Sequence, residues 1–469
     1  MPNLSGITIA LQAVLAQSQA MQIIEHNIAN ANTPGYRRQS AILTATVPAP
    51  VNGSDYVKGG PGQVGTGVTI DRIQRFSLQL FDGRYRSVGA ESKNWEAQSN
   101  VLGQFEAIMT ETSDDGMLAK FDQFWSGWRA LSNDPTNASL RTVLLDDANS
   151  LANGFKRRYE QINQLRIDQN LMVSDQVDQV NALAGDVASL NAEISRVLSV
   201  GDQPNDLLDK RDLALDKLAQ LTGSVSYEQK NGEVSVSIGG HVLVVGHDAF
   251  KLRTVQNTSG DPTVVDVFWE DNQKVILPSG ELKGVLDVRD TFLKNQQTEL
   301  NAVASKFISE VNAIHITGYG PSTVTPENFF VAGGNASNIA VQIQDPGKVA
   351  TSSGPFVAGK NDIALAISKL KDATVMARGT VNVTMNNYYN GLVTDRALAA
   401  RRATENSTHQ SAVLKSLDLQ RESASGVSLD EEAANMARTQ KAYQAAARVL
   451  TAYDEMLDTV INRMGMVGR

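Results

Sequence analysis

Residues 428–464 read SLDEEAANMARTQKAYQAAARVLTAYDEMLDTVINRM and decide the fold class. Ser428 and Glu431 have the spacing of a capping box, and the acidic first turn suits the dipole of a helix that begins there. Apolar side chains then recur in steps of three and four, which keeps them on one face of a helix. The segment therefore predicts a long amphipathic helix with coiled-coil spacing, and its stripe contains Met436, Tyr443, Leu450, Leu457, Ile461 and Met464.

The first residues of the chain carry a similar stripe, whose members are Leu4, Ile7, Leu11, Val14, Met21 and Ile28. Glu25 is the only charged residue before Arg37, so a helix here is almost uncharged around its circumference. Such a helix needs burial on more than one side. We expect the two terminal helices to pack on each other and on neighbouring copies of the chain, with both stripes forming an assembly seam.

A turn is expected directly after the N-terminal stripe, where the chain reads Asn30-Ala31-Asn32-Thr33-Pro34-Gly35-Tyr36. Proline disfavours helical geometry at the residue before it, and Pro-Gly suits the two central positions of a type II turn. The helix should therefore end near Asn30.

The interior of the chain predicts a rod of helices. Helical pattern begins near Phe76, and a very long helix is expected from a cap at Asn133-Asp134 to about Val200, with a break possible near Gly154 or Gly185. Further helical patterns cover 205–221, 286–314 and 386–424, whereas 317–385 is mixed and Gly-rich. Aromatic residues at helical intervals are expected to be buried in the core; they are Phe121, Phe124, Trp125 and Trp128.

Residues 224–284 change character, because apolar and polar residues alternate on either side of Gly239-Gly240, which predicts β-hairpins. The fold class is therefore mainly α with a β insertion, in a nested order. We expect a terminal helical coiled-coil domain (1–36 plus 425–469), an elongated helical rod domain with short β segments (37–223 plus 285–424), and a small inserted antiparallel β domain (224–284) at the far tip.

Composition excludes several functions. The chain has 469 residues, a formal net charge of −9 and no cysteine. An acidic chain is a poor candidate for binding nucleic acid. The absence of cysteine excludes disulfides and metal sites with cysteine ligands. The five histidines have no metal-ligand spacing, and G-x-G-x-x-G at 60–65 leads into a strand rather than a helix. The acidic groups, Asp430-Glu431-Glu432 among them, suit caps and solvated faces. We expect no cofactor, no metal, no catalytic residue, no membrane span and no cleaved signal peptide.

The motifs taken together resemble a known family. Residues 27–39, NIANANTPGYRRQ, are similar to the N-terminal signature of flagellar rod, hook and hook-associated proteins, although Arg37 stands where serine is frequent. Residues 205–212, NDLLDKRD, and 425–435, SGVSLDEEAAN, resemble stretches of the hook-associated proteins found at the hook–filament junction. The motif residues of the N-terminal signature are Asn30, Asn32, Thr33, Pro34, Gly35 and Tyr36.

The resemblance implies an extracellular structural protein of the bacterial flagellum and no enzymatic activity. Such a protein leaves the cell through the flagellar type III export apparatus and forms a ring of helically arranged copies on which the filament grows. Its implied partners are other copies of itself, the hook protein, a second junction protein or flagellin, and an export chaperone that binds the C-terminal segment. No nucleic acid and no membrane are implied.

Three alternatives remain open at this point. The chain could be another axial protein of the flagellum, such as a hook protein or a flagellin, although residues 207–212 and 425–435 argue against that. It could be an enzyme carried on a flagellar scaffold, but no His, Cys or paired-carboxylate motif supports that hypothesis. The β insertion could also bind host molecules, as in a surface adhesin.

Overall fold

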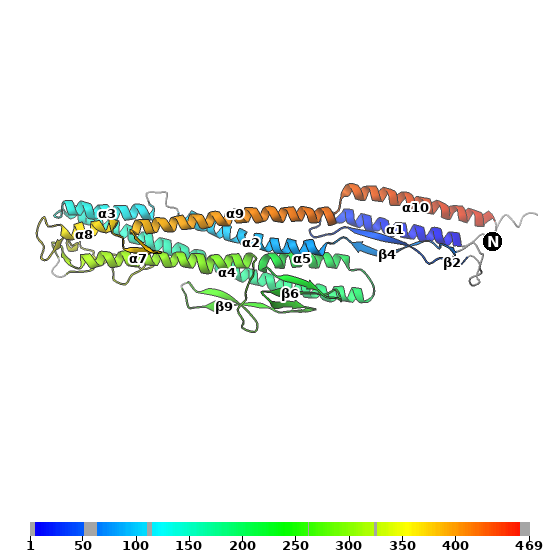
Figure 1. Cartoon of the computed structure of the whole chain (residues 1–469), viewed down its shortest axis with the longest axis horizontal. Helices are drawn as coiled ribbons and strands as arrows, with labels where there is room; N and C mark the ends of the chain where they lie inside the picture. Colours follow the sequence, from blue (N-terminus) through cyan, green and yellow to red (C-terminus); the bar gives the residue numbers. More distant parts are fainter. Residues whose placement is uncertain (1–4, 51–62, 110–114, 261, 323–325, 460–469) are drawn as a thin grey trace, which may run out of the picture.

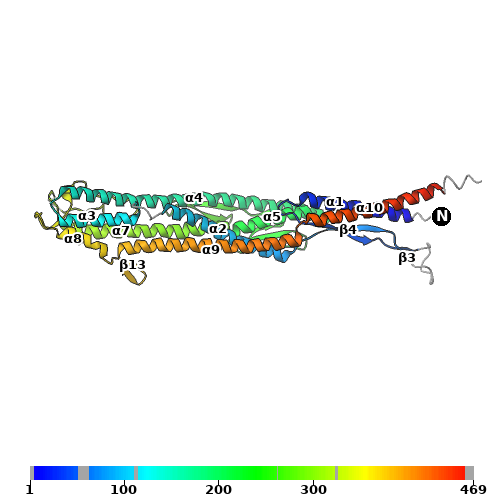
Figure 2. The ribbon, with the colours of Figure 1, turned by 90° about the horizontal axis from the view of Figure 1, so that it is seen from above.

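The computed structural model describes residues 5–50, 63–109, 115–260, 262–322 and 326–459. The molecule is a long rod in which most helices run parallel to the long axis (Figures 1 and 2). The first helix, α1 (Ser5–Asn30), and the last, α10 (Leu429–Asp458), lie side by side at one end. The fold class predicted from the sequence is confirmed, since the chain is mainly helical with small antiparallel sheets and packed terminal helices.

The rod is built around a single helix, α4 (Ala138–Ser199), whose 62 residues correspond to about 93 Å. It passes Gly154 and Gly185 without a break. Its N-cap is Asn137, which accepts hydrogen bonds from the backbone N–H groups of Ser139 and Leu140. The predicted cap at Asn133-Asp134 was therefore wrong. Those residues end α3 (Met117–Asn133), because Pro135 cannot continue that helix.

Further helical segments of the rod lie beside α4 or beside one another. They are α2 (Gln79–Ile108), α5 (Asn205–Thr222), α6 (Glu281–Asp287), a π-helical segment (Val288–Leu293), α7 (Lys294–His315) and α9 (Met385–Ser425). Of these, α9 packs on α2 and α7. At the end of the rod far from the termini, the four predicted aromatic residues are buried, as expected, against Phe307, Phe329 and Phe330. Residues 317–385 close this end with α8 (Asp362–Lys369) and short strands.

The β insertion forms a four-stranded antiparallel sheet, in the order β5 (Val225–Glu228), β6 (Val234–Ile238), β7 (His241–Val245) and β8 (Asp248–Ala249), and a hairpin of β9 (Leu252–Asn257) with β10 (Val264–Trp269). Apolar residues of the sheet and hairpin share a core with the second half of α4 and with α5. The insertion therefore lies along the flank of the rod and not at its far tip, which corrects the sequence prediction (Figure 1).

A β-ribbon leaves the rod beside α1. Strands β1 (Gln39–Ala45) and β4 (Val68–Arg75) pair antiparallel with one irregularity between Ile42 and Leu43, and β2 (Ala49–Pro50) pairs with β3 (Gln63–Val64). The ribbon packs along α1. Half of the G-x-G-x-x-G match at 60–65, residues 60–62, lies outside the described residues.

His315, near the distal end, is held in one neutral form. Its Nδ1–H donates to the carbonyl of Glu327 at 2.8 Å, and its Nε2 accepts from the backbone N–H of Ala350 at 2.9 Å. A second proton would set Nε2–H against that N–H donor. Burial accordingly lowers the pKa of His315 from about 6.5 to about 4.

We predict that acid destabilises this end of the rod. The lowered pKa means that unfolded chains bind the proton first, so stability is lost as pH falls from about 6.5 towards 4, by about 3 kcal/mol in total. Denaturant titrations at pH 7 and pH 4.5 measure this loss. The variant His315→Gln should flatten the dependence, whereas His409→Gln, which changes an exposed histidine of α9, should retain it. Equal pH profiles for both variants would contradict the assignment.

Candidate functional site

The terminal helices form an antiparallel pair with contacts at both ends. Near the N-terminus of α1, Gly6 lies against the Tyr453 ring of α10 and leaves no room for a Cβ. Near the other end, Asn27 donates to Glu432 Oε2 at 3.0 Å. Each helix therefore runs along the other for most of its length.

This pairing covers the two helices incompletely. Ala10, Ala16, Ile24 and Asn27 are buried in α1, and Glu432 is the one residue buried in the described part of α10. The predicted seam residues Ile7, Val14, Met21, Ile28, Met436, Tyr443, Leu450 and Leu457 are half-buried. Leu4, Ile461 and Met464 lie outside the described residues. Even with the ribbon beside α1, part of the surface of each helix remains in water.

Several large apolar side chains lie on that exposed surface. Leu11 and Leu15 of α1 are 45% and 56% exposed, and Val449 and Met456 of α10 are 47% and 48% exposed. We call these four residues the open flanks. Of these four residues, only Leu11 belongs to the seam predicted from the sequence. Leu15 follows Leu11 by one helical turn, and this spacing could have identified Leu15 from the sequence. Within the described residues, the segment Gly6–Asn30 is also long and apolar enough to cross a membrane by composition alone.

The motif residues 30–36 build the predicted turn. The backbone N–H of Tyr36 donates to the carbonyl of Thr33 at 3.1 Å, and Gly35 has a φ of +81°, so Pro34 and Gly35 occupy the centre of a type II turn. Asn30 ends α1 and accepts a hydrogen bond from the Thr33 hydroxyl at 3.1 Å, whereas Asn32 is exposed. The Tyr36 hydroxyl donates to Asn27 Oδ1 at 2.7 Å. The turn is thereby fixed to α1.

Directly beyond the turn, charged residues from distant segments meet on one face of α5. Asp209, Asp212 and Asp216 are spaced by three and four residues and therefore share that face. Arg75 of β4 bonds Asp209 and Asp212, and Arg86 of α2 bonds Asp212 at 2.9 Å and Asp216 at 2.7 Å. We call this cluster, together with the residues of the next paragraph, the charged hub.

Two further arginines connect the segments next to the terminal helices to the hub. Arg37 makes a two-pronged ion pair with Asp82 of α2, at 2.7 and 2.8 Å, and lies 3.3 Å from Asp212. Arg421 of α9 donates to Asp216 at 2.6 Å and stacks on the Tyr85 ring. The hub therefore connects the turn after α1 and the end of α9 to the rod. Arg37, the departure from the family signature, is buried in it.

Solvation and charge oppose each other in the hub. Burial would raise the pKa of Asp212, but Arg75, Arg37 and Arg86 outweigh it and lower that pKa below its ordinary value. For Asp209, burial dominates over the same kind of contact and raises the pKa. Asp212 is consequently the carboxylate whose charge the hub stabilises most clearly.

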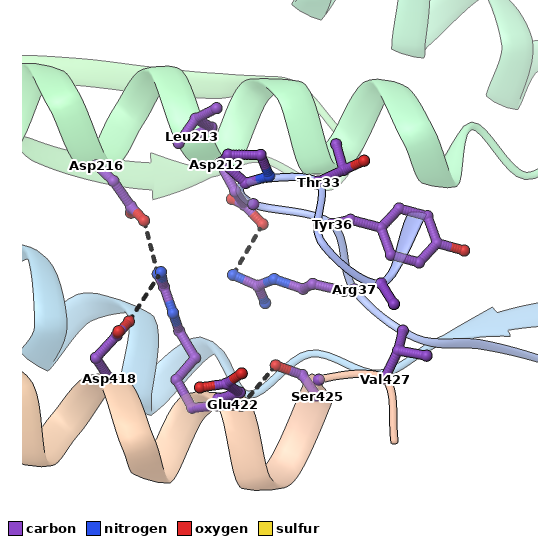
Figure 3. A pocket seen from close by; sticks show the side chains of 15 residues that line it. Thr33, Tyr36, Arg37, Asp212, Leu213, Asp216, Asp418, Glu422, Ser425 and Val427 are labelled. Atoms are coloured by element: carbon purple, nitrogen blue, oxygen red, sulfur yellow. Dashed lines mark hydrogen bonds and ion pairs between the residues drawn. The ribbon is translucent and has the colours of Figure 1, made fainter. Parts of the chain in front are cut away.

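A polar cavity of about 260 Å³ lies beside the hub, between the 31–37 turn and the end of α9 (Figure 3). Arg37 points towards Asp212 in this cavity. Arg421 also lines the cavity and pairs with Asp216. Within the part of the chain that the structure describes, no group of three His, Asp or Glu side chains is placed to hold a metal ion. The arrangement fixes elements to one another.

Glu432, at the start of α10, corrects one sequence prediction. It is 1% exposed, accepts from Asn27, and pairs with Arg38 at 2.8 Å, so it is not part of a solvated cap. The preceding Glu431 also pairs with Arg38, at 2.9 Å, but is exposed. Ser428 does cap the helix as predicted, accepting from the backbone N–H of Glu431.

Comparisons with known proteins agree with this architecture. Residues 102–330 match the model of the flagellar hook-associated protein FlgK helical domain, residues 420–464 that of the flagellar basal body rod FlgEFG protein C-terminal region, and residues 7–37 that of the flagella basal body rod protein. The chain is 30% identical to flagellar hook-associated protein 1 of Bacillus subtilis, over 99% of both chains. It is 25% identical to the Salmonella typhimurium protein of that name, over 98% of this chain and 99% of the relative.

A solved structure shares the fold. It is the flagellar hook junction protein FlgK from Burkholderia pseudomallei, which superimposes with a TM-score of 0.66 over 74% of this chain and 100% of that one, at 18% identity.

We predict that Asp212→Asn destabilises the rod by about 3 kcal/mol, because it leaves buried arginines without their shared carboxylate. Asp71→Asn is the matched control, since Asp71 pairs with Arg72 on an exposed part of the ribbon and should contribute less than about 1 kcal/mol. Urea denaturation of the two variants measures both effects. Similar losses in the two variants would contradict the role of the hub.

Proposed function

The chain belongs to the family of flagellar hook-associated protein 1, structural and non-enzymatic components of the extracellular axial part of the bacterial flagellum, and on that premise we propose that it forms the junction ring between hook and filament. In this proposal, copies assemble helically through α1 and α10, and the filament grows on the resulting ring. The partners are further copies of the chain, the hook protein, and a second junction protein or flagellin.

The observation that carries the proposal is the exposure of the open flanks. Burying a leucine, valine or methionine side chain that stood in water contributes roughly 2 kcal/mol. Each copy holds Leu11, Leu15, Val449 and Met456 about half exposed at one end of the rod. Neighbouring copies packed around that end would cover them, and the gain is repeated at every contact, which favours a cooperative polymer.

The remaining parts have separate tasks in the proposal. The terminal pair (1–36 plus 425–469) forms the inner wall of the ring, the rod (37–223 plus 285–424) makes contacts outside it, and the β insertion (224–284) faces solvent. Because the hub connects the terminal pair to the rod by charged contacts, the two are oriented together. Before assembly, an export chaperone covers the C-terminal segment, and the chain leaves the cell through the flagellar export apparatus.

Deleting the gene tests the proposal directly. We expect cells that carry hooks without filaments and that release flagellin into the medium, because the filament has no surface on which to grow. Electron microscopy of the cells and analysis of the medium measure both effects, and expression of the intact chain should restore filaments. Filaments of normal number and attachment in the deletion strain would refute the proposal.

A single substitution tests the open flanks. We expect Leu15→Asp to abolish filament attachment while leaving the free energy of unfolding of the isolated chain within about 0.5 kcal/mol, because the side chain is already in water there. Gln22→Asp adds the same charge two turns further along the same exposed face and should retain filaments. Complementation of the deletion strain, with motility and microscopy as readouts, compares the two. Normal filaments in the Leu15→Asp strain would remove the α1 flank from the assembly surface.

A further inference from the structure

The pairing of α1 with α10 has a defined register. The Gly6–Tyr453 and Asn27–Glu432 contacts are 21 residues apart along each helix, since 27 − 6 and 453 − 432 are equal. This is three heptads. Between them, Ala20 and Thr439 line one groove, which agrees with the same register. In this register Ile9, Ala16 and Ile23 lie opposite Leu450, Tyr443 and Met436.

Apolar packing alone does not determine that register. The seam of α10 repeats every seven residues, and so do Ile9, Ala16 and Ile23 on α1. Sliding one helix by a heptad, about 10.5 Å, would still place apolar residues opposite apolar residues. The seam is also only half-buried, so each lost contact is weakly penalised. The hub restrains the ends of α1 and α9, and a directional interaction within the helix pair can further distinguish the native register from the slipped ones.

Glu432 has the properties required for that discrimination. Its carboxylate is buried and meets Asn27 of α1 on one oxygen and Arg38, just beyond the turn, on the other. Neither partner is repeated seven residues away: Ala20 stands where Asn27 would be after a slip in one direction, and Pro34 after a slip in the other. A buried carboxylate without partners is strongly unfavourable, so a slipped pair would either expose Glu432 or leave it unpaired.

We propose that Glu432, with Asn27 and Arg38, is the register latch of the terminal helices: a positioning residue that selects one antiparallel alignment from several that the apolar heptads permit. The inference rests on the proposed function, because the alignment determines which flank residues a copy presents to its neighbours. A buried polar group that selects register at a cost in stability is a known device in helix pairs.

The chain contains no cysteine, so engineered disulfides can report the register. The native register is read by Ala20→Cys with Thr439→Cys. Registers slipped by one heptad are read by Ala13→Cys with Thr439→Cys, and by Ala20→Cys with Ala446→Cys. A slip of about 10.5 Å separates these pairs well beyond disulfide reach. Oxidation is followed on denaturing gels, where cross-links within a chain and between chains migrate differently, for the purified chain in solution and for flagella sheared from cells.

In the unaltered background we expect the native pair alone to cross-link. In Glu432→Gln, the ratio of native to slipped cross-links should fall by at least about tenfold. Glu431→Gln is the matched control, because it removes the same charge from the same turn and from the same Arg38, but from an exposed position, and its ratio should stay unchanged. An unchanged ratio in Glu432→Gln, or an equal fall in Glu431→Gln, overturns the latch.

A double variant separates the latch from a general loss of folding. Arg38→Gln alone should also lower the native cross-link, because it leaves the Glu432 carboxylate buried without its cation. The double variant Arg38→Gln with Glu432→Gln should recover part of the native cross-link, because the two side-chain amides can form a hydrogen bond. No recovery overturns the latch. If the native cross-link forms in solution but the chain is missing from sheared flagella, the proposed function fails and the latch stands; if no native cross-link forms in either sample, the latch fails.

Discussion

A pair of helices buries only the faces that meet, and the exposure of the remaining apolar surface is the constraint on which the interpretation of this molecule depends. The chain places its nearly uncharged first helix against its last helix and against the β-ribbon, and among the described residues this packing leaves the open flanks in water. The large cores lie elsewhere, in the aromatic cluster at the distal end and beside the β insertion. The molecule therefore has a well-packed rod and, at one end, a pair of helices with large apolar side chains exposed.

Apolar contact and charge have different roles at that end. Apolar contacts together contribute a large free energy, but they are not directional. Two helices with heptad repeats can therefore align in several registers with similar apolar contacts. The charged contacts are directional and unique. Asp209, Asp212 and Asp216 receive arginines from separate segments, and Glu432 receives Asn27 and Arg38. In our proposal, the charged groups orient the helix pair, and the exposed apolar groups provide the surface for association.

The sequence predicted those features that depend on local periodicity. The helix ends at Asn30 and Ser428, the type II turn at Pro34-Gly35, the great length of α4 and the strands of the insertion all follow from residue spacing and capping chemistry. The position of the insertion was wrong because alternation reveals a strand but not the surface on which it packs. The hub was missed because its partners are up to about two hundred residues apart, as in Arg421–Asp216. Glu432 looks like any acidic residue of a first turn until its burial is known.

Both described ends of the chain lie at the same pole of the rod (Figure 2). The path runs out from that pole and returns to it, and the hub holds the outgoing and returning segments together. Residues added to or removed from the β9–β10 hairpin or the loops around α8 therefore leave the spacing between the two terminal helices unaltered. The distal half can therefore differ in length and surface without a change in the terminal helix pair. If the chain assembles as proposed, this half is the natural place to graft a foreign peptide for multivalent display.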